Sequence, residues 1–121
     1  MDSPVKGFSH AQLRVADVEA SVAWYSAAVG LQAAGPPQSG AVAMYGAGGR
    51  FAIVISEGYT GGVHLDHLAF GVADREALEA WAESLTEAGV PHEGVCETPV
   101  GFELHLRDPD GLDVELLVPK S

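Results

Sequence analysis

The chain contains a stretch of sequence that occurs twice. Residues 10–24 read HAQLRVADVEASVAW and residues 67–81 read HLAFGVADREALEAW, so eight of fifteen positions are identical at a shift of 57 residues. That shift is almost half of the 121-residue chain. The repeat therefore predicts two copies of one small unit, each of which begins with a histidine.

The length and composition predict one globular domain built from these two copies. A chain of 121 residues with 47% hydrophobic residues is long enough to bury a core. We expect a single domain over residues 1–121, with modules at 1–62 and 63–121. The single cysteine, Cys96, excludes an internal disulfide and fits a reducing compartment. With no apolar run near the ~20 residues of a membrane span and no secretory signal pattern, we expect a cytoplasmic protein without membrane association.

The chain is strongly acidic, with 17 acidic and 6 basic side chains and a net charge of −11. Binding to a nucleic-acid backbone needs clusters of lysine and arginine, so nucleic acid is excluded as a partner. An acidic surface is compatible with a cationic ligand, either a metal ion or a basic drug. It also keeps a protein soluble without any further role.

The first copy predicts one strand, one helix and then three strands. Polar and apolar residues alternate over 8–15, which is typical of a strand with one buried face. A helix follows between Asp17, a plausible N-cap, and Gly30, a glycine at the position where helices end. Its apolar stripe is formed by Val18, Val22, Tyr25 and Val29. The other strands are expected near 31–34, 41–46 and 51–56.

The second copy repeats this plan after a joint at 58–63. A strand is expected at 65–72, and a helix between the N-cap Asp74 and Gly89. Further strands are expected near 93–97, 102–107 and 112–118. The sequence DPDG at 108–111 predicts a tight turn, because proline presets φ at its second position and glycine closes it.

Three residues of metal-ligand type fall on the predicted strands, on the face opposite the helices: His10, His67 and Glu115. Glutamate is depleted in strand interiors, so Glu115 within an apolar strand needs a reason. If the two units pair about a local two-fold axis, their sheets can form a shared cleft that contains both imidazoles. Two histidines and one acid are the facial set that binds Fe(II) and similar divalent ions while leaving positions open for a substrate.

These features resemble the vicinal oxygen chelate superfamily, which groups glyoxalase I, extradiol dioxygenases, and fosfomycin and bleomycin resistance proteins. The matching pieces are HAQLRVADVEASVAWY at 10–25, DHLAFGVAD at 66–74 and LRDPDGLDVELL at 106–117. The resemblance implies an α+β fold of two βαβββ modules in tandem that form a curved mixed-sheet cleft. It also implies that His10, His67 and Glu115 bind a divalent ion (Fe2+, Mn2+, Zn2+ or Ni2+), and that the protein is a homodimer.

The fourth metal position of the glyoxalase I-like members has no clear counterpart. On the strand at 51–56, the bulky residues Phe51, Ile53 and Ile55 are expected to face the helix. Glu57 follows with the wrong parity, so only a bulge would bring it to the cleft, and it is a doubtful ligand. Three protein ligands match the dioxygenase or fosfomycin type better than the glyoxalase type.

Other residues are candidates for contact with a substrate. Gln12 and Arg14 share the face of His10, and Arg14 is either an anion clamp or an ordinary surface arginine. Either Met44 or Tyr45 is expected to line the pocket. His105 is a candidate general acid–base because its unperturbed pKa is near neutrality, and the alternative is an exposed strand histidine without such a role.

Two further histidines, His64 and His92, fall in a joint and a turn and are expected to be solvated. The favoured function is a metal-dependent enzyme, dioxygenase-like or lyase- or isomerase-like, whose oxygenated small-molecule substrate chelates the ion. The alternative is a metal-free protein that sequesters an antibiotic, as bleomycin resistance proteins do. A fosfomycin-type thiol transferase is a weaker alternative, because few basic residues lie near the proposed cleft to bind a phosphonate.

Overall fold

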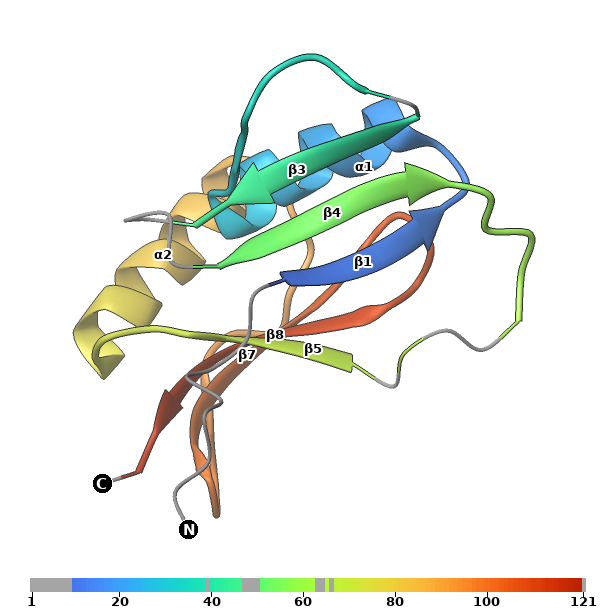
Figure 1. Ribbon diagram of the computed structural model, residues 1–121. Coiled ribbons are helices and arrows are strands. Elements are labelled where there is room, and N and C mark those ends of the chain that lie inside the picture. Colours follow the sequence, from blue (N-terminus) through green and yellow to red (C-terminus); the bar gives the residue numbers. More distant parts are fainter. Residues whose placement is uncertain (1–9, 39, 47–50, 63–64, 66, 121) are drawn as a thin grey trace, which may run out of the picture. The chain divides into compact units, whose positions relative to one another are not determined.

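The computed structural model describes residues 10–38, 40–46, 51–62, 65 and 67–120 (Figure 1). The chain divides into two compact units, Met1–Gly61 and Gly62–Ser121. Each unit contains one four-stranded mixed sheet and one helical segment, which confirms the predicted α+β fold of two βαβββ modules. The unit boundary lies one residue before the predicted one. That the two units form a single domain stays a prediction.

Unit 1 contains a sheet with the strand order β1-β4-β3-β2. The strands are β1 (His10–Val15), β2 (Gln32–Ala33), β3 (Ala41–Tyr45) and β4 (Ala52–Glu57). β1 runs parallel to β4, and the other neighbours are antiparallel. Along β1, β3 and β4, alternate apolar side chains face the core. The core residues Leu13, Val42, Met44, Ile53 and Ile55 are at most 5% exposed. Residues 8 and 9 of the predicted first strand lie outside the described residues.

The helical segment of unit 1 differs from the predicted uniform helix. α1 (Val18–Trp24) starts at Asp17, whose side chain accepts a hydrogen bond from Ala20 N at 3.1 Å. The chain then forms one π-helical segment, η1 (Tyr25–Val29), and ends at Gly30 with φ 81°. A π turn is wider than an α turn and shifts the buried face. Consequently, the predicted stripe is wrong in part, because Ala28 is fully buried whereas Val29 is only half-buried.

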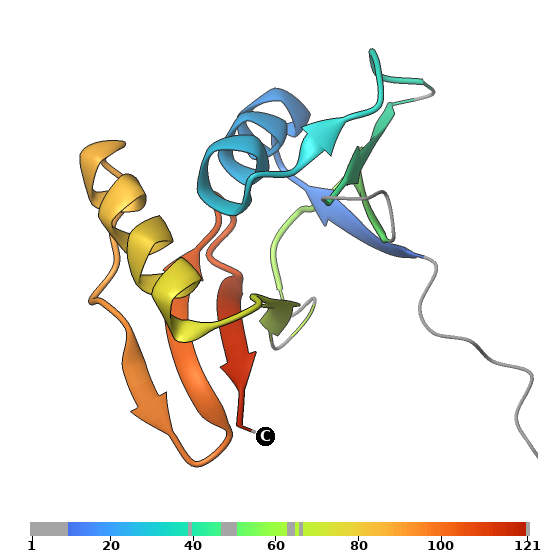
Figure 2. The ribbon, with the colours of Figure 1, turned by 90° about the vertical axis from the view of Figure 1, so that its left-hand side faces the viewer.

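Unit 2 contains a sheet with the order β5-β8-β7-β6. The strands are β5 (His67–Gly71), β6 (Cys96–Thr98), β7 (Gly101–Arg107) and β8 (Asp113–Pro119), and the helix is α2 (Arg75–Glu87). β5 runs parallel to β8. Figure 2 shows α2 running alongside the strands of this sheet. The core lies between them, and its fully buried side chains are Leu78, Leu85, Leu104, Leu106 and Val114.

The predicted ends of the second helix and the predicted turn are confirmed. Asp74 accepts a hydrogen bond from Ala77 N at 2.8 Å, and the helix ends before Gly89, which has φ 77°. In the turn, Gly111 N donates to Asp108 O at 2.9 Å. The Asp108 carboxylate also accepts from Leu112 N at 2.8 Å. These bonds fix how β8 returns alongside β7. In the part of the chain that the structure describes, no helix is long and apolar enough to cross a membrane.

Two expectations about the segment after α2 are wrong. His92 is not simply solvated: its Nδ1 accepts from Gly94 N at 3.0 Å and its Nε2 lies 3.0 Å from Ala82 O. Nε2 also lies 2.8 Å from Thr86 Oγ1. This histidine holds the segment before β6 against α2, and the strand forms at Cys96–Thr98 rather than near 93–97.

Candidate functional site

The outer face of the unit 2 sheet, opposite α2, carries a cluster of ionisable side chains. The strand register aligns them in rows across β5, β8 and β7. His67 is paired with Asp113, and Glu115 is paired with both Ala69 and His105. Glu103 lies one row further along β7. Strand alternation therefore places two imidazoles and three carboxylates on one face.

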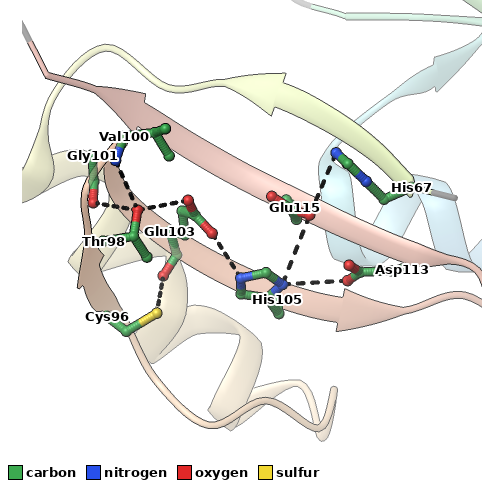
Figure 3. A network of polar contacts seen from close by, with 9 residues as sticks. All are labelled: His67, Cys96, Thr98, Val100, Gly101, Glu103, His105, Asp113 and Glu115. Atoms are coloured by element: carbon green, nitrogen blue, oxygen red, sulfur yellow. Dashed lines mark hydrogen bonds and ion pairs between the residues drawn. The ribbon is translucent and has the colours of Figure 1, made fainter.

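Glu115 lies between two imidazoles on this face (Figure 3). Its Oε2 atom is 3.7 Å from His67 Nε2 and 4.0 Å from His105 Nδ1. The Glu115 side chain is only 13% exposed, whereas both histidine rings are nearly half-exposed. The structure thus brings together two predicted metal ligands, His67 and Glu115, and the predicted acid–base residue His105.

His105 is held by two further carboxylates. Its Nε2 donates a hydrogen bond to Glu103 Oε1 at 2.8 Å, and its Nδ1 lies 3.4 Å from Asp113 Oδ1. Partial burial acts to lower the pKa of His105, but the hydrogen bonds to Glu103 and Asp113 and the charge of Glu115 outweigh it, so the pKa is raised. Since both ring nitrogens face carboxylate oxygens, the arrangement favours the doubly protonated ring.

The pKa of Glu115 is also raised. Burial is the main cause, because it disfavours the charged carboxylate. The nearby imidazoles of His67 and His105 oppose the shift, and the charges of Asp113 and Glu103 add to it. A carboxylate surrounded by other carboxylates is a place where a bound cation relieves repulsion.

Glu103 is a site residue that the sequence reasoning missed. It is 7% exposed, and Thr98 Oγ1 lies 2.8 Å from its second oxygen, Oε2. Like Glu115, it is a glutamate in the middle of an apolar strand, FELHLR, at two residues from His105. The same signal that singled out Glu115 was therefore available for Glu103.

Three residues of this face bring possible metal-donor atoms close together. Glu103, His105 and Glu115 each offer one donor atom, and these atoms lie within 4.8 Å of one another. Beside them, a hollow of about 600 Å³ extends from the segment 91–94 to Asp113 and Arg107. Cys96 also lines this hollow, with its Sγ 3.6 Å from the backbone oxygen of Glu103.

The outer face of the unit 1 sheet carries the other predicted residues. His10, Gln12 and Arg14 lie on β1 and are exposed, and Gln12 Nε2 donates to Ser56 Oγ at 3.2 Å. Tyr45 belongs to this face and is 39% exposed, whereas Met44 is fully buried on the other. Of the two pocket candidates, only Tyr45 is therefore accessible to a ligand on this face.

Glu57 lies on the opposite face of β1–β4 from His10. The register pairs it with Val15, a core residue that is 1% exposed, and its own side chain is exposed at the end of β4. The position that corresponds to Glu115 is occupied by Val54, which is paired with Gln12 as Glu115 is with Ala69. No bulge interrupts the β1–β4 register.

Comparison with known proteins identifies the family. The model of the Glyoxalase/Bleomycin resistance protein/Dioxygenase superfamily matches residues 7–116. The chain belongs to this superfamily. The resemblance drawn from the sequence is thus confirmed, and members of the superfamily usually use a divalent metal ion and bind small molecules. A search of the curated proteins finds no significant match.

Solved structures of the superfamily share the fold over almost the whole chain. A glyoxylase/bleomycin resistance protein/dioxygenase domain from Frankia sp. EAN1pec is 27% identical, with a TM-score of 0.80 and coverage of 97% of this chain and 94% of that one. Lactoylglutathione lyase from Agrobacterium tumefaciens is 20% identical, with a TM-score of 0.79 and 96% coverage of both chains. TnmS3, an antibiotic binding protein from Streptomyces sp. CB03234, is 22% identical, with a TM-score of 0.80 and coverage of 98% and 100%. The last two likenesses show the fold alone.

Proposed function

We propose that the protein is a metal-dependent enzyme of the vicinal oxygen chelate type, in which two histidines and one glutamate hold a divalent ion that an oxygenated small molecule chelates. The observation that carries the proposal is the pair of His67 Nε2 and Glu115 Oε2, 3.7 Å apart on the outer face of unit 2. The reaction is dioxygenase-like or lyase-like.

The donor atoms fit such an ion. Bonds from zinc to imidazole nitrogen and carboxylate oxygen are about 2.0–2.2 Å long, so two donors of one ion lie at most about 4.3 Å apart. The separation of 3.7 Å between His67 and Glu115 is within this limit. Imidazole and carboxylate together suit Fe2+, Mn2+, Zn2+ or Ni2+. The superfamily resemblance supplies His10 as the third ligand. Glu57 is not included, because it lies on the opposite face of the sheet from His10.

The residues around these ligands have proposed roles of their own. A bound ion of this kind acts as a Lewis acid toward substrate oxygens or, as Fe2+, activates dioxygen. His105, whose ring is nearly half-exposed beside Glu115, is proposed to give or take a substrate proton at Nδ1. Gln12, Arg14 and Tyr45, which share the outer face of unit 1, are proposed to bind the substrate.

Metal analysis tests the proposal. Protein purified without chelator, and then equilibrated with each of Fe2+, Mn2+, Ni2+, Zn2+ and Co2+, is expected to retain one ion per chain. His67→Ala, Glu115→Gln and His10→Ala are each expected to weaken binding by at least about 100-fold. The matched control is Glu97→Gln, because Glu97 is exposed and pairs with Lys120 at 3.2 Å. Wild-type protein that retains none of these ions contradicts the proposal.

A metal-free protein that binds a cationic drug is the second candidate. It is favoured by the three carboxylates on the outer face of unit 2 and by the net charge of −11. Equilibrium binding to a panel of cationic antibiotics separates the two candidates. Tight binding that is unchanged by chelator supports sequestration rather than catalysis.

We also propose that the protein is a cytoplasmic homodimer. The single cysteine fits a reducing compartment, and strands at the edges of open sheets are often covered by two-fold pairing. Light scattering at micromolar concentration is expected to give twice the chain mass of 12.6 kDa. A mass of one chain would rule out the dimer.

A further inference from the structure

We propose that Thr98, Glu103 and His105 form a hydrogen-bonded chain that positions Glu115 for metal binding. The inference rests on the proposed function, because it takes Glu115 as a metal ligand. It adds three positioning residues on β6 and β7, of which Thr98 and Glu103 were not among the sequence candidates. None of the three is proposed to touch the ion.

The series of hydrogen bonds from Thr98 to His105 begins at the β6–β7 hairpin. Val100 N donates to Thr98 Oγ1 at 3.3 Å, so the hydroxyl oxygen is anchored as an acceptor. The hydroxyl proton is left to be donated, and Glu103 Oε2 is the nearer acceptor at 2.8 Å, against 3.2 Å for Gly101 O. The Glu103 side chain is only 10% exposed, and a buried carboxylate needs such partners. Thr98 thereby fixes the rotation of the Glu103 carboxylate.

Glu103 in turn fixes the ring of His105. Its other oxygen, Oε1, accepts from His105 Nε2 at 2.8 Å, which is the length of a charge-assisted hydrogen bond. With Nε2 held, Nδ1 has a defined direction: it faces Asp113 Oδ1 at 3.4 Å and Glu115 Oε2 at 4.0 Å (Figure 3). A free imidazole on an exposed strand would sample several rotamers. This one is tethered at its far end.

Glu115 is the residue that this series of hydrogen bonds positions. The same oxygen, Oε2, that lies 3.7 Å from the proposed ligand His67 lies 4.0 Å from His105. Carboxylates that bind metals are themselves held by outer partners, and loss of such a partner typically weakens metal binding 10–100-fold. His105 takes the place of that partner through its charge, because its Nδ1 hydrogen-bonds Asp113 and lies at ion-pair distance from Glu115.

The close grouping of Glu103, His105 and Glu115 has a competing explanation, namely that all three bind an ion directly. The ring nitrogen Nε2 of His105 already donates its proton to Glu103 at 2.8 Å, and a protonated nitrogen has no lone pair for a metal. Direct binding through Nε2 would break this bond, and direct binding through Nδ1 would remove the proton that this nitrogen directs at Asp113, 3.4 Å away. The two arrangements make opposite predictions for how replacing His67 or His105 changes ion binding.

Co2+ binding to the whole chain, measured by calorimetry and by visible absorption, tests the positioning role. Glu103→Gln and His105→Gln are each expected to weaken Co2+ binding by about 10–100-fold. The double variant is expected to bind Co2+ as weakly as His105→Gln alone, because Glu103 acts on Glu115 only through His105. The Co2+ spectrum should stay unchanged in Glu103→Gln and in His105→Gln and should change in His67→Ala, because of these three residues only His67 is a proposed ligand. Glu97→Gln is the control.

Folding of each metal-free variant is checked by thermal unfolding. If Glu103→Gln does not fold, Thr98→Val replaces it; this variant removes one hydroxyl and is expected to bind Co2+ up to about tenfold more weakly.

The outcomes separate this inference from the proposed function. If the wild type binds no Co2+, both fail. If it binds Co2+ and Glu103→Gln binds equally well, or if the losses of the single variants add in the double variant, only the positioning role is overturned. Complete loss in His105→Gln together with full affinity in His67→Ala overturns both the positioning role and the proposed ligand set, and assigns the ion to Glu103, His105 and Glu115.

Discussion

The outer faces of the two sheets carry different side chains at corresponding strand positions. The imidazole of His105 and the carboxylates beside it in unit 2 are replaced in unit 1 by small or aliphatic side chains. By strand register, Ala41, Ala43 and Val54 of unit 1 correspond to Glu103, His105 and Glu115 of unit 2. Among the described residues at corresponding strand positions, the histidine at the start of the first strand is the one ionisable side chain common to both faces, as His10 and His67.

The buried parts of the two units are alike. Each helix starts at an aspartate whose side chain accepts from the third following backbone N–H, and each helical segment ends at a glycine with positive φ. The repeat has therefore kept what folds each unit and changed what each outer face can bind. Donor atoms for a cation are concentrated in unit 2.

The largest expected effect concerns the cores, which the comparison treats as equivalent. Ile55→Ala in unit 1 and Leu104→Ala in unit 2 each remove a fully buried side chain and should lower the free energy of unfolding by about 2–5 kcal/mol. The fluorescence of Trp24 and Trp81, each measured in a variant that lacks the other tryptophan, reports on one unit at a time. A single domain predicts that both signals change at one denaturant concentration. Separate midpoints would show that the units unfold independently.

The next effect is specific to unit 2. Glu103→Ala removes the partner of Thr98 and of His105 and should cost about 1–3 kcal/mol of unfolding free energy. Chemical denaturation measures the change. Glu97→Ala on the neighbouring strand should stay within about 0.5 kcal/mol of the wild type. An equally small effect of Glu103→Ala would mean that the network adds nothing to stability.

Much of this arrangement follows from the sequence. Alternation along the strands predicted that His67 and Glu115 share a face, because side chains two residues apart on a strand point the same way. The structure adds His105 to this face through its pairing with Glu115. Glu103 obeys the same rule and was overlooked. The bonds of His92 were beyond reach, because its partners Ala82 and Thr86 lie on α2 and are met only after the chain has turned back.

The π-helical segment was not predictable either. Its sequence, YSAAV, contains neither proline nor glycine, and a pattern of apolar residues assumes a constant turn width. The placement of His10 as a ligand together with His67 and Glu115 stays a prediction that rests on the superfamily.

The helix caps should show the smallest change in stability and the same change in both units. Asp17→Ala and Asp74→Ala each remove one side-chain hydrogen bond to the first helical turn, at 3.1 and 2.8 Å. Each should lower the unfolding free energy by about 1 kcal/mol. Thermal unfolding followed by circular dichroism measures both, and a cap that matters in only one unit would break the symmetry of the scaffold.

The pH dependence is a test of the unit 2 face alone. The pKa of His105 is raised above 6.5, so its stabilising contribution is complete below about pH 6.5 and is lost as the pH rises through the folded-state pKa. The pKa of Glu115 is raised as well, so its contribution to stability is also lost as the pH rises, beginning at about pH 4.5. NMR titration of the His105 ring in metal-free protein should give a midpoint above 6.5, and Glu103→Gln should lower it. A midpoint at or below 6.5 would contradict the environment described for this ring.

The turn at 108–111 has a consequence for how the protein tolerates changes in length. Asp108 fixes it with backbone and side-chain hydrogen bonds, and β8 enters the sheet directly after it. Because side chains alternate along a strand, inserting or deleting one residue here would turn Glu115 toward the core and Leu116 outward. A single-residue insertion at 108–111 should therefore abolish the proposed cation binding.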